Sequence, residues 1–409
     1  MMTNLVCGVF PRYRSWLRMQ QSRKTFQLPF ILIVCGGVFF FANNHMLTIV
    51  IPLYLDSLKA SIALIGYSSA AMGAVAFSFR FVCPYLFKKI RLNKILFFSH
   101  LLLCLITLSF LFADHPLQVF LIRALYGIPL AMFPLYYLLL IRKLSTNAQQ
   151  LISYASIGGF AMPVSLAVSP FIAEYISNQF SFQAAYTAAL LVSVLSFLCM
   201  FTGSLLIHKT SNPILEPLRY QSVLQEGAGN KKATLIPIIC YVYLGVVDSI
   251  VLSFLPLYAL SITGSFSFYF LVFSATMVIS QTFLRRFNIL RHSRTLLRLG
   301  YCSLMLTVLV IVSPLGSASL ILSAFFFGLG FSLVETTTNS VIISTIQSEA
   351  DSSLINYQQI SISIGRTLSP FLFGLAVATF GYTSSFIGSG VLGLFIVLAL
   401  GKYRKSALL

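Results

Sequence analysis

Long apolar stretches separated by short polar or turn-forming clusters run along the whole chain. Each stretch is about 20 residues or longer and lacks the alternation that strands show, which predicts membrane-spanning helices rather than a barrel. Typical breaks are "ADHP" at 113–116 and "SPLGS" at 313–317. Twelve spans are expected, at 27–54, 61–87, 95–112, 117–141, 149–176, 184–207, 233–260, 265–284, 295–313, 318–346, 353–380 and 384–401.

The pattern also repeats half a chain apart. "IPLYLDSL" at 51–58 returns as "LPLYALSI" at 255–262, an offset of 204 residues. A second pair of similar segments, 153–172 and 356–372, lies four spans later in each half. Two matches in register predict duplication of a six-helix unit. We therefore expect an all-α polytopic membrane protein of twelve helices in two pseudo-symmetric six-helix bundles.

The only long break divides these halves and sets the domain boundaries. It contains prolines, glycines and mixed charge, which is typical of a flexible linker. The expected parts are a basic tail at 1–26, an N-terminal bundle at 27–207, a linker at 208–232, a C-terminal bundle at 233–401 and a tail at 402–409.

Composition agrees with a membrane protein, because 58% of residues are hydrophobic and only 9% are charged. The net charge of +18 first suggests nucleic acid. However, 23 of the 27 Lys and Arg residues lie in segments on one side of the predicted spans. This bias places both termini in the cytoplasm, so the basicity reports topology and not a nucleic-acid partner.

Polar residues inside the spans are the candidates for function, because an ionisable group near the centre of a bilayer costs about 2.5–3.5 kcal/mol. Four of the predicted spans carry polar residues near the middle of the membrane: Asn43, Asn44, His45, Asp248, Glu335 and Arg366. Asp248 and Glu335 are candidates for proton coupling, since one arginine cannot neutralise both carboxylates. The candidates for substrate binding are Asn43, Asn44, His45, Arg123 and Arg366.

Other chemistries lack their motifs. The sequence has no phosphate-binding Walker loop, no CxxC or HExxH spacing and no nucleophile elbow, so we expect no enzyme, metal or cofactor. The seven cysteines are expected to be packing residues.

Two motifs carry a family resemblance. Arg123-Ala-Leu-Tyr-Gly127, followed by Ala131, resembles the RxxxG motif of the fourth helix of the major facilitator superfamily. The connection from Arg80 to Lys94 stands where that family has a Gly-rich loop with an acidic and several basic residues, although Pro84, Lys88 and Arg91 replace a glycine, the aspartate and a glycine. The resemblance implies a gating role for the basic residues of this connection, Arg80, Lys88, Lys89 and Arg91.

A narrower resemblance concerns the first two spans. Segments 41–58 and 77–81 are similar to small bacterial exporters of metallophores and siderophores. This resemblance implies efflux across the bacterial inner membrane. The slight positive excess of Arg123, Arg366 and His45 over two carboxylates favours an anionic or zwitterionic solute, siderophore-like, metallophore-like or drug-like, and we expect proton coupling by a protein that works as a monomer. A proton-coupled importer of a nutrient or siderophore is the alternative, and a non-transporting sensor or assembly partner is a further one.

Overall fold

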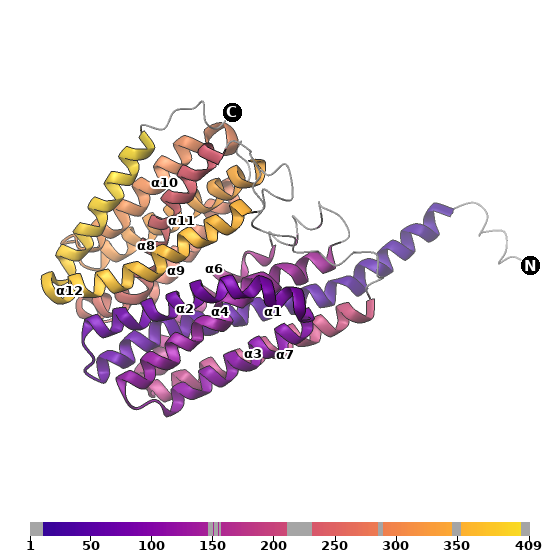
Figure 1. Cartoon of the computed structure of the whole chain (residues 1–409), viewed down its shortest axis with the longest axis horizontal. Helices are drawn as coiled ribbons and strands as arrows, with labels where there is room; N and C mark the ends of the chain where they lie inside the picture. Colours follow the sequence, from indigo (N-terminus) through magenta and orange to yellow (C-terminus); the bar gives the residue numbers. More distant parts are fainter. Residues whose placement is uncertain are drawn as a thin grey trace, which may run out of the picture.

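The computed structural model describes residues 11–145, 150, 154, 157–210, 231–284, 289–345 and 353–401. Within these residues the protein is all-helical (Figure 1). The elements are α1 (Pro11–Ser57), α2 (Ile62–Lys89), α3 (Leu92–Ser109), η1 (Phe110–Phe112), α4 (Pro116–Leu144), α6 (Ala161–Gln179), α7 (Phe182–Thr210), α8 (Lys231–Thr263), α9 (Ser267–Leu284), α10 (Ile289–Ile311), α11 (Ser317–Thr345) and α12 (Ser353–Gly401).

Ten helices of the described part are long and apolar enough to cross a membrane, which confirms a polytopic membrane protein. Twelve spans were expected, and two features explain the lower count. Residues 358–398 form one long candidate inside α12, which bends at Gly381 (φ 78°), where the sequence predicts a break between two spans. Helix α6 has 19 residues but ends on the polar residues Glu174, Ser177, Asn178 and Gln179, and it is not among the ten.

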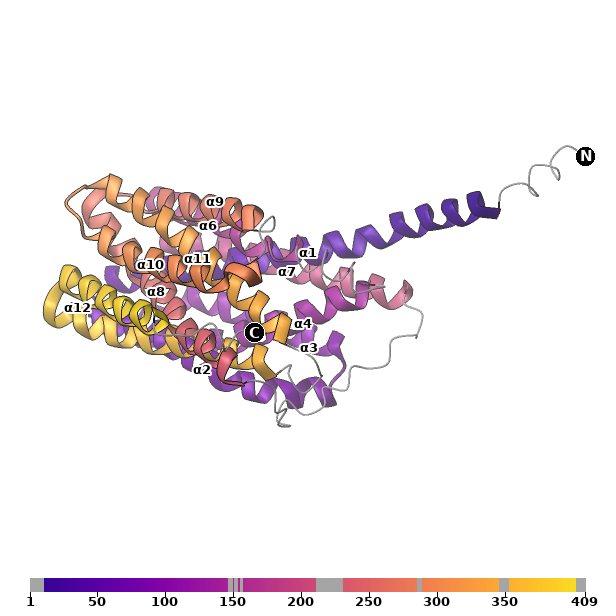
Figure 2. The ribbon, with the colours of Figure 1, turned by 90° about the horizontal axis from the view of Figure 1, so that it is seen from above.

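Helix α1 begins at Pro11, well before the first predicted span, and its N-terminal part extends past the rest of the bundle (Figure 2). Residues 11–26 are basic and contain no glycine, so they can continue the helix although they are too polar to form a span. The apolar part of the helix is 28–57.

Two hydrophobic clusters form the interior. One is built by α1, α2, α3, α4, α6 and α7, and the other mainly by α8 to α12. Figure 1 shows the C-terminal helices, in orange and yellow, lying against the N-terminal helices, in indigo to pink. The chain therefore packs as two halves. We call the end where α1 passes to α2, and α8 to α9, the distal end.

The repeated segments pack in equivalent ways. Tyr54 on α1 contacts Phe182 and Tyr186 at the start of α7, with ring centroids 5.3 and 5.5 Å away. Its counterpart on α8, Tyr258, contacts Tyr382 and Phe386 just after the bend in α12, at 5.4 Å each. Equivalent residues of the repeat thus make equivalent contacts in the two halves.

Helices α1 and α8 join the halves through residues at equivalent positions. Ile49 and Leu53 of α1 pack into the C-terminal cluster. Leu257, the repeat counterpart of Leu53, packs against the N-terminal cluster as well as its own. Each half therefore inserts the same face of its first helix into the other.

Helices α2 and α12 also join the halves, and glycine permits their close approach. A Cβ atom added to Gly66 would lie 2.3 Å from the carbonyl oxygen of Pro370 and 3.2 Å from the Cα of Gly374. One added to Gly73 would lie 2.8 Å from Thr367 Oγ1. The two backbones therefore come close together here, as small residues allow in membrane helices.

A carboxylate makes the third contact between the halves. Glu174, near the distal end of α6, is 8% exposed, and its Oε2 accepts hydrogen bonds from the backbone N–H of Ser267 at 2.9 Å and of Phe266 at 3.4 Å. The Ser267 hydroxyl also donates to it. Glu174 thus caps the N-terminus of α9, where unsatisfied N–H groups and the helix dipole favour an anion.

Candidate functional site

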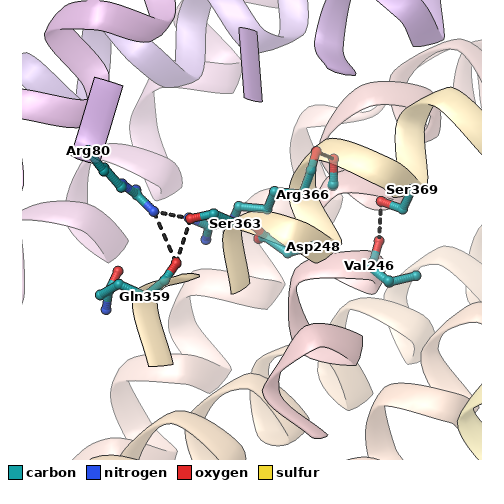
Figure 3. A network of polar contacts seen from close by, with 8 residues as sticks. Arg80, Val246, Asp248, Gln359, Ser363, Arg366 and Ser369 are labelled. Atoms are coloured by element: carbon teal, nitrogen blue, oxygen red, sulfur yellow. Dashed lines mark hydrogen bonds and ion pairs between the residues drawn. The ribbon is translucent and has the colours of Figure 1, made fainter. Parts of the chain in front are cut away.

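An ion pair lies between α8 and α12 in the C-terminal half. Arg366 Nε is 2.7 Å from Asp248 Oδ2, and the Ser249 hydroxyl donates to the backbone oxygen of Arg366 at 3.1 Å. Figure 3 shows Arg366 reaching Asp248 from the facing helix. The two side chains differ in accessibility, because that of Asp248 is 2% exposed and that of Arg366 is 37% exposed. The arginine thus holds the buried carboxylate by one nitrogen while the rest of its side chain remains accessible.

Glu335 on α11 belongs to the same electrostatic group. Arg366 and Asp248 are its charged neighbours, and Tyr241 of α8 is an electrostatic neighbour of all three. The side chain of Glu335 is half-buried. Among the described residues it forms neither an ion pair nor a hydrogen bond, in contrast to Asp248. The structure therefore brings the two predicted coupling carboxylates together and gives them different surroundings.

Arg80 lies on helix α2 rather than in the connection that follows it. Its guanidinium crosses to α12, where Nη1 donates to the carbonyl oxygen of Gln359 at 3.1 Å and to the Ser363 hydroxyl (Figure 3). Arg366 is an electrostatic neighbour of Arg80. Ser363 precedes Arg366 by three residues, so Arg80 contacts α12 about one helical turn from Arg366.

The three consecutive candidates on α1 have different environments. Asn43 is fully buried in the N-terminal half, where its Nδ2 donates to Ala189 O at 2.9 Å and its Oδ1 accepts from Tyr126 OH at 2.8 Å. A residue so enclosed has the contacts of a packing residue. His45 is 1% exposed, and neither ring nitrogen has a hydrogen-bond partner within the described part of the chain.

His45 lies one turn from Ile49 on the face of α1 that meets the C-terminal half, and Arg366 is its charged neighbour. Asn44 is half-buried, and its Oδ1 is without a partner among the described residues. Of the three, His45 is the one that the structure brings near the ion pair.

Arg123 on α4 is not part of this group. It is 1% exposed and donates from Nη1 to the Ser68 hydroxyl at 3.2 Å, inside the N-terminal half. Its electrostatic neighbour is Tyr186, and among the described residues Arg123 forms no ion pair with the charged residues around Arg366. The residues predicted to bind substrate thus lie in two separate places, with Arg123 apart from Arg366.

The basic connection between α2 and α3 lies at the end opposite to the distal end. Lys89 and Arg91 are exposed there, while the side chain of Lys88 falls outside the described residues. Arg91 precedes α3 without a side-chain cap.

Several polar neighbours of the site were missed in the sequence. Gln358 donates to Asn339 Oδ1 at 2.8 Å, beside Tyr241. Glu335 and Asn339 are four residues apart on α11, so their shared helix face was readable from the spacing. No group of three or more His, Cys, Asp or Glu side chains suited to a metal occurs in the described residues.

Comparison with known proteins places this geometry in a family. The sequence profile of the Major Facilitator Superfamily matches residues 32–356, and no curated protein matches the chain. Solved structures resemble it at low identity. The nucleoside transporter NupG has a TM-score of 0.71 at 14% identity, covering 93% of this chain and 100% of that one. Tetrameric PepTSo2 has a TM-score of 0.70 at 13% identity, covering 92% and 97%.

A third structure is a bacterial homologue of the human lysosomal transporter Spinster, in an inward-facing and unoccupied conformation. Its TM-score is 0.65 at 10% identity, covering 94% of this chain and 97% of that one. These identities establish the fold alone. The resemblance to metallophore exporters has no counterpart in these comparisons. The profile match spans most of the sequence, and the fold is that of a transporter rather than an enzyme. The chain belongs to the Major Facilitator Superfamily.

Proposed function

We propose that the protein is a proton-coupled secondary transporter that moves a small anionic or zwitterionic solute by alternating access. The observation that carries this proposal is the unequal pair at the centre of the C-terminal half. Arg366 is accessible while its partner Asp248 is buried, and a second carboxylate, Glu335, lies beside them without a partner among the described residues.

Arg366 is the proposed contact for the solute. It occupies the middle of a predicted span, where a charged side chain that is 37% exposed has to face protein or a water-filled path rather than lipid. Only Nε is engaged by Asp248, so the terminal amino groups can donate to a carboxylate or another planar anion. A solute anion there would compete with Asp248 for the same cation.

Glu335 is the proposed first proton acceptor. Direct contact with Arg366 favours the charged form of Asp248, whereas Glu335 has only longer-range electrostatic neighbours. Burial disfavours a charge that lacks a partner, so a proton on Glu335 relieves that cost. When the solute engages Arg366, Asp248 loses its cation and becomes the second group able to take a proton.

The contacts between the halves support rocking. They involve α1 with α8, α2 with α12 and α6 with α9, and equivalent faces of the repeat take part. Two halves with separate hydrophobic interiors can move as rigid bodies around a central site. We propose the boundaries 27–207 and 233–401 for these halves, with both termini in the cytoplasm of a bacterial cell, as the distribution of basic residues predicts.

The direction of transport is proposed from sequence resemblance. Similarity of segments 41–58 and 77–81 to metallophore and siderophore exporters favours efflux of such a solute, and the protein is proposed to work as a monomer. Import by the same site is the alternative, and the direction of the productive proton gradient decides between them.

The test is transport by the purified full-length protein in proteoliposomes with an imposed pH gradient. Citrate and dialanine serve as anionic and zwitterionic probes, and uridine as a neutral one. We expect pH-driven accumulation of a charged probe, and Glu335→Gln should reduce it about tenfold or more, equivalent to about 1.4 kcal/mol. Exchange of labelled for unlabelled probe without a gradient should continue in this variant.

Arg366→Lys keeps the charge but loses the planar fork, so we expect a higher KM for the charged probe. Asp56→Asn, which changes an exposed carboxylate far from the site, should behave as wild type. If Glu335→Gln and Asp248→Asn both retain gradient-driven accumulation, the coupling assignment is wrong. A preference for uridine would contradict the solute class.

A further inference from the structure

The described part of the N-terminal half contains a buried cation that forms no ion pair within it. Arg123 is 1% exposed, and no described carboxylate forms an ion pair with it. The carboxylates of the described N-terminal half have other places, because Asp56 and Asp114 are exposed and Glu174 binds the N-terminus of α9. A guanidinium does not give up its proton in a protein, and buried charges are normally paired. Something else has to neutralise Arg123.

One edge of this guanidinium has no partner. Nη1 donates to the Ser68 hydroxyl at 3.2 Å, while Nε and Nη2 are buried and without a hydrogen-bond partner in the described residues. Nε–H and an Nη2–H group point the same way along one edge of the plane, as two parallel donors. This edge is the one with which arginine binds anions bidentately.

A third buried donor without a partner in the described residues belongs to Tyr186 on α7. Its hydroxyl is buried and also lacks a partner among the described residues, and the side chain is 1% exposed. Tyr186 and Arg123 are electrostatic neighbours of each other. Three unpaired donors from two facing helices thus occur together, next to a positive charge and enclosed by the N-terminal half.

The neighbouring layer limits the size of a ligand. One turn along α4 and α7, Tyr126 and Ala189 both bind Asn43, so the polar groups of that layer are already satisfied. Ser68 donates its own proton to Ile65 O at 2.8 Å and therefore only accepts from Arg123. This layer therefore offers no free polar group to a bulky solute. A water molecule would accept hydrogen bonds from the donors but would not neutralise the charge of Arg123.

We propose that a small monovalent inorganic anion, with chloride as the abundant candidate, binds between Arg123 and Tyr186. It accepts from Nε and Nη2 of Arg123 and from the hydroxyl of Tyr186. This site is separate from the solute contact at Arg366, and its role is to neutralise the buried arginine and to hold α4 against α7. The proposal does not depend on the transported solute.

The test measures thermal unfolding of the purified full-length protein in potassium chloride, potassium bromide and potassium gluconate at equal ionic strength. Because a ligand that binds the folded state raises Tm, we expect a saturable rise of about 2 °C or more in either halide relative to gluconate. Arg123→Gln should remove the halide effect. Tyr186→Phe should shift the midpoint of the chloride titration upward by about tenfold, the effect of one lost hydrogen bond to a charged group.

Tyr301→Phe is the matched control. Tyr301 is fully buried and its hydroxyl is also unpartnered in the described residues, but it lies on α10 in the other half. Its variant should keep the wild-type halide response. Equal Tm values for the wild type in chloride and gluconate would overturn the proposal, and so would a full response in Tyr186→Phe. If Arg123→Gln does not fold, the Tyr186→Phe titration decides alone.

Discussion

The contacts α2/α12 and α6/α9 join the two halves near the distal end by different chemistry. At a repeat offset of 200 residues, Glu174 of α6 corresponds to Gly374 of α12. Gly374 approaches the backbone of Gly66, whereas Glu174 accepts hydrogen bonds from Ser267 and Phe266. The two contacts therefore lie at equivalent places in the duplicated fold, but one is a close approach of backbones and the other a set of hydrogen bonds to a carboxylate.

The difference matters for the alternating access proposed for the two halves. A backbone contact between glycines depends on close fit, so an added side chain clashes and forces the two helices apart. A carboxylate on a helix N-terminus depends on hydrogen bonds that water can replace when the helices separate. We infer that α2 and α12 set how closely the halves approach, and that Glu174 sets how readily α6 leaves α9.

The largest effect is expected at the glycine contact. In Gly66→Leu the new Cβ would lie 2.3 Å from Pro370 O, so α2 and α12 must move apart. Overpacking of this kind costs about 3 kcal/mol, which lowers Tm by about 3–4 °C in a chain of 409 residues. Thermal unfolding in detergent measures it.

Gly388→Leu is the control for that substitution, because no heavy atom lies within 4 Å of a Cβ added at Gly388. Its Tm should stay within about 1 °C of wild type. A similar loss of Tm in both variants would show that the effect comes from the leucine itself and not from the α2/α12 contact.

An intermediate effect is expected at Glu174. Glu174→Ala leaves the N-terminus of α9 without its acceptor, at a cost of about 2 kcal/mol, or a roughly thirtyfold shift toward states with α6 and α9 apart. Spin labels at Tyr175 and Phe268, both exposed, should report a longer distance population by double electron–electron resonance.

Asp114→Asn is the matched control for Glu174, since Asp114 is an exposed acidic residue beyond the end of η1. It should leave the distance distribution unchanged. An unchanged distribution in Glu174→Ala would contradict the assigned role and leave the α6/α9 contact to apolar packing alone.

The smallest effect is expected for Ser267→Ala. This variant removes the hydroxyl that donates to Glu174 and, at 3.1 Å, to Pro170 O, but it retains both backbone N–H donors. The loss should be about 1 kcal/mol, a roughly fivefold population shift with the same labels. A shift as large as that of Glu174→Ala would mean that the side chain, and not the helix N-terminus, holds the carboxylate.

Much of the fold was readable from the sequence, and the candidate site was readable in part. Hydrophobic runs gave the helices, and the repeated "PLY" segments placed Tyr54 and Tyr258 in equivalent positions, which the packing bears out. The costly polar residues Asp248, Glu335 and Arg366 were predicted together and lie together. Depth along a helix can be counted in residues, which is why this grouping could be predicted from the sequence.

Which face of a helix meets which neighbour was not accessible in the same way. Asn43 and His45 are two residues apart, yet one is enclosed by the N-terminal half and the other meets the C-terminal half. Arg123 was predicted to contact the same solute as Arg366, and it lies apart from Arg366 inside the N-terminal half. Rotation about a helix axis depends on packing against other helices, which one sequence does not reveal in spans that are apolar on most sides.

By itself, the sequence determined that this protein spans a membrane with many helices in two related halves, because hydrophobic length and repetition are local properties of the chain. Tertiary structure decided the pairing of Arg366 with Asp248, the lack of an ion pair at Glu335 and at Arg123 among the described residues, and the contact of Glu174 with α9. The physical reason is that a buried charge is defined by its neighbours in space, and these come from helices far apart in the sequence.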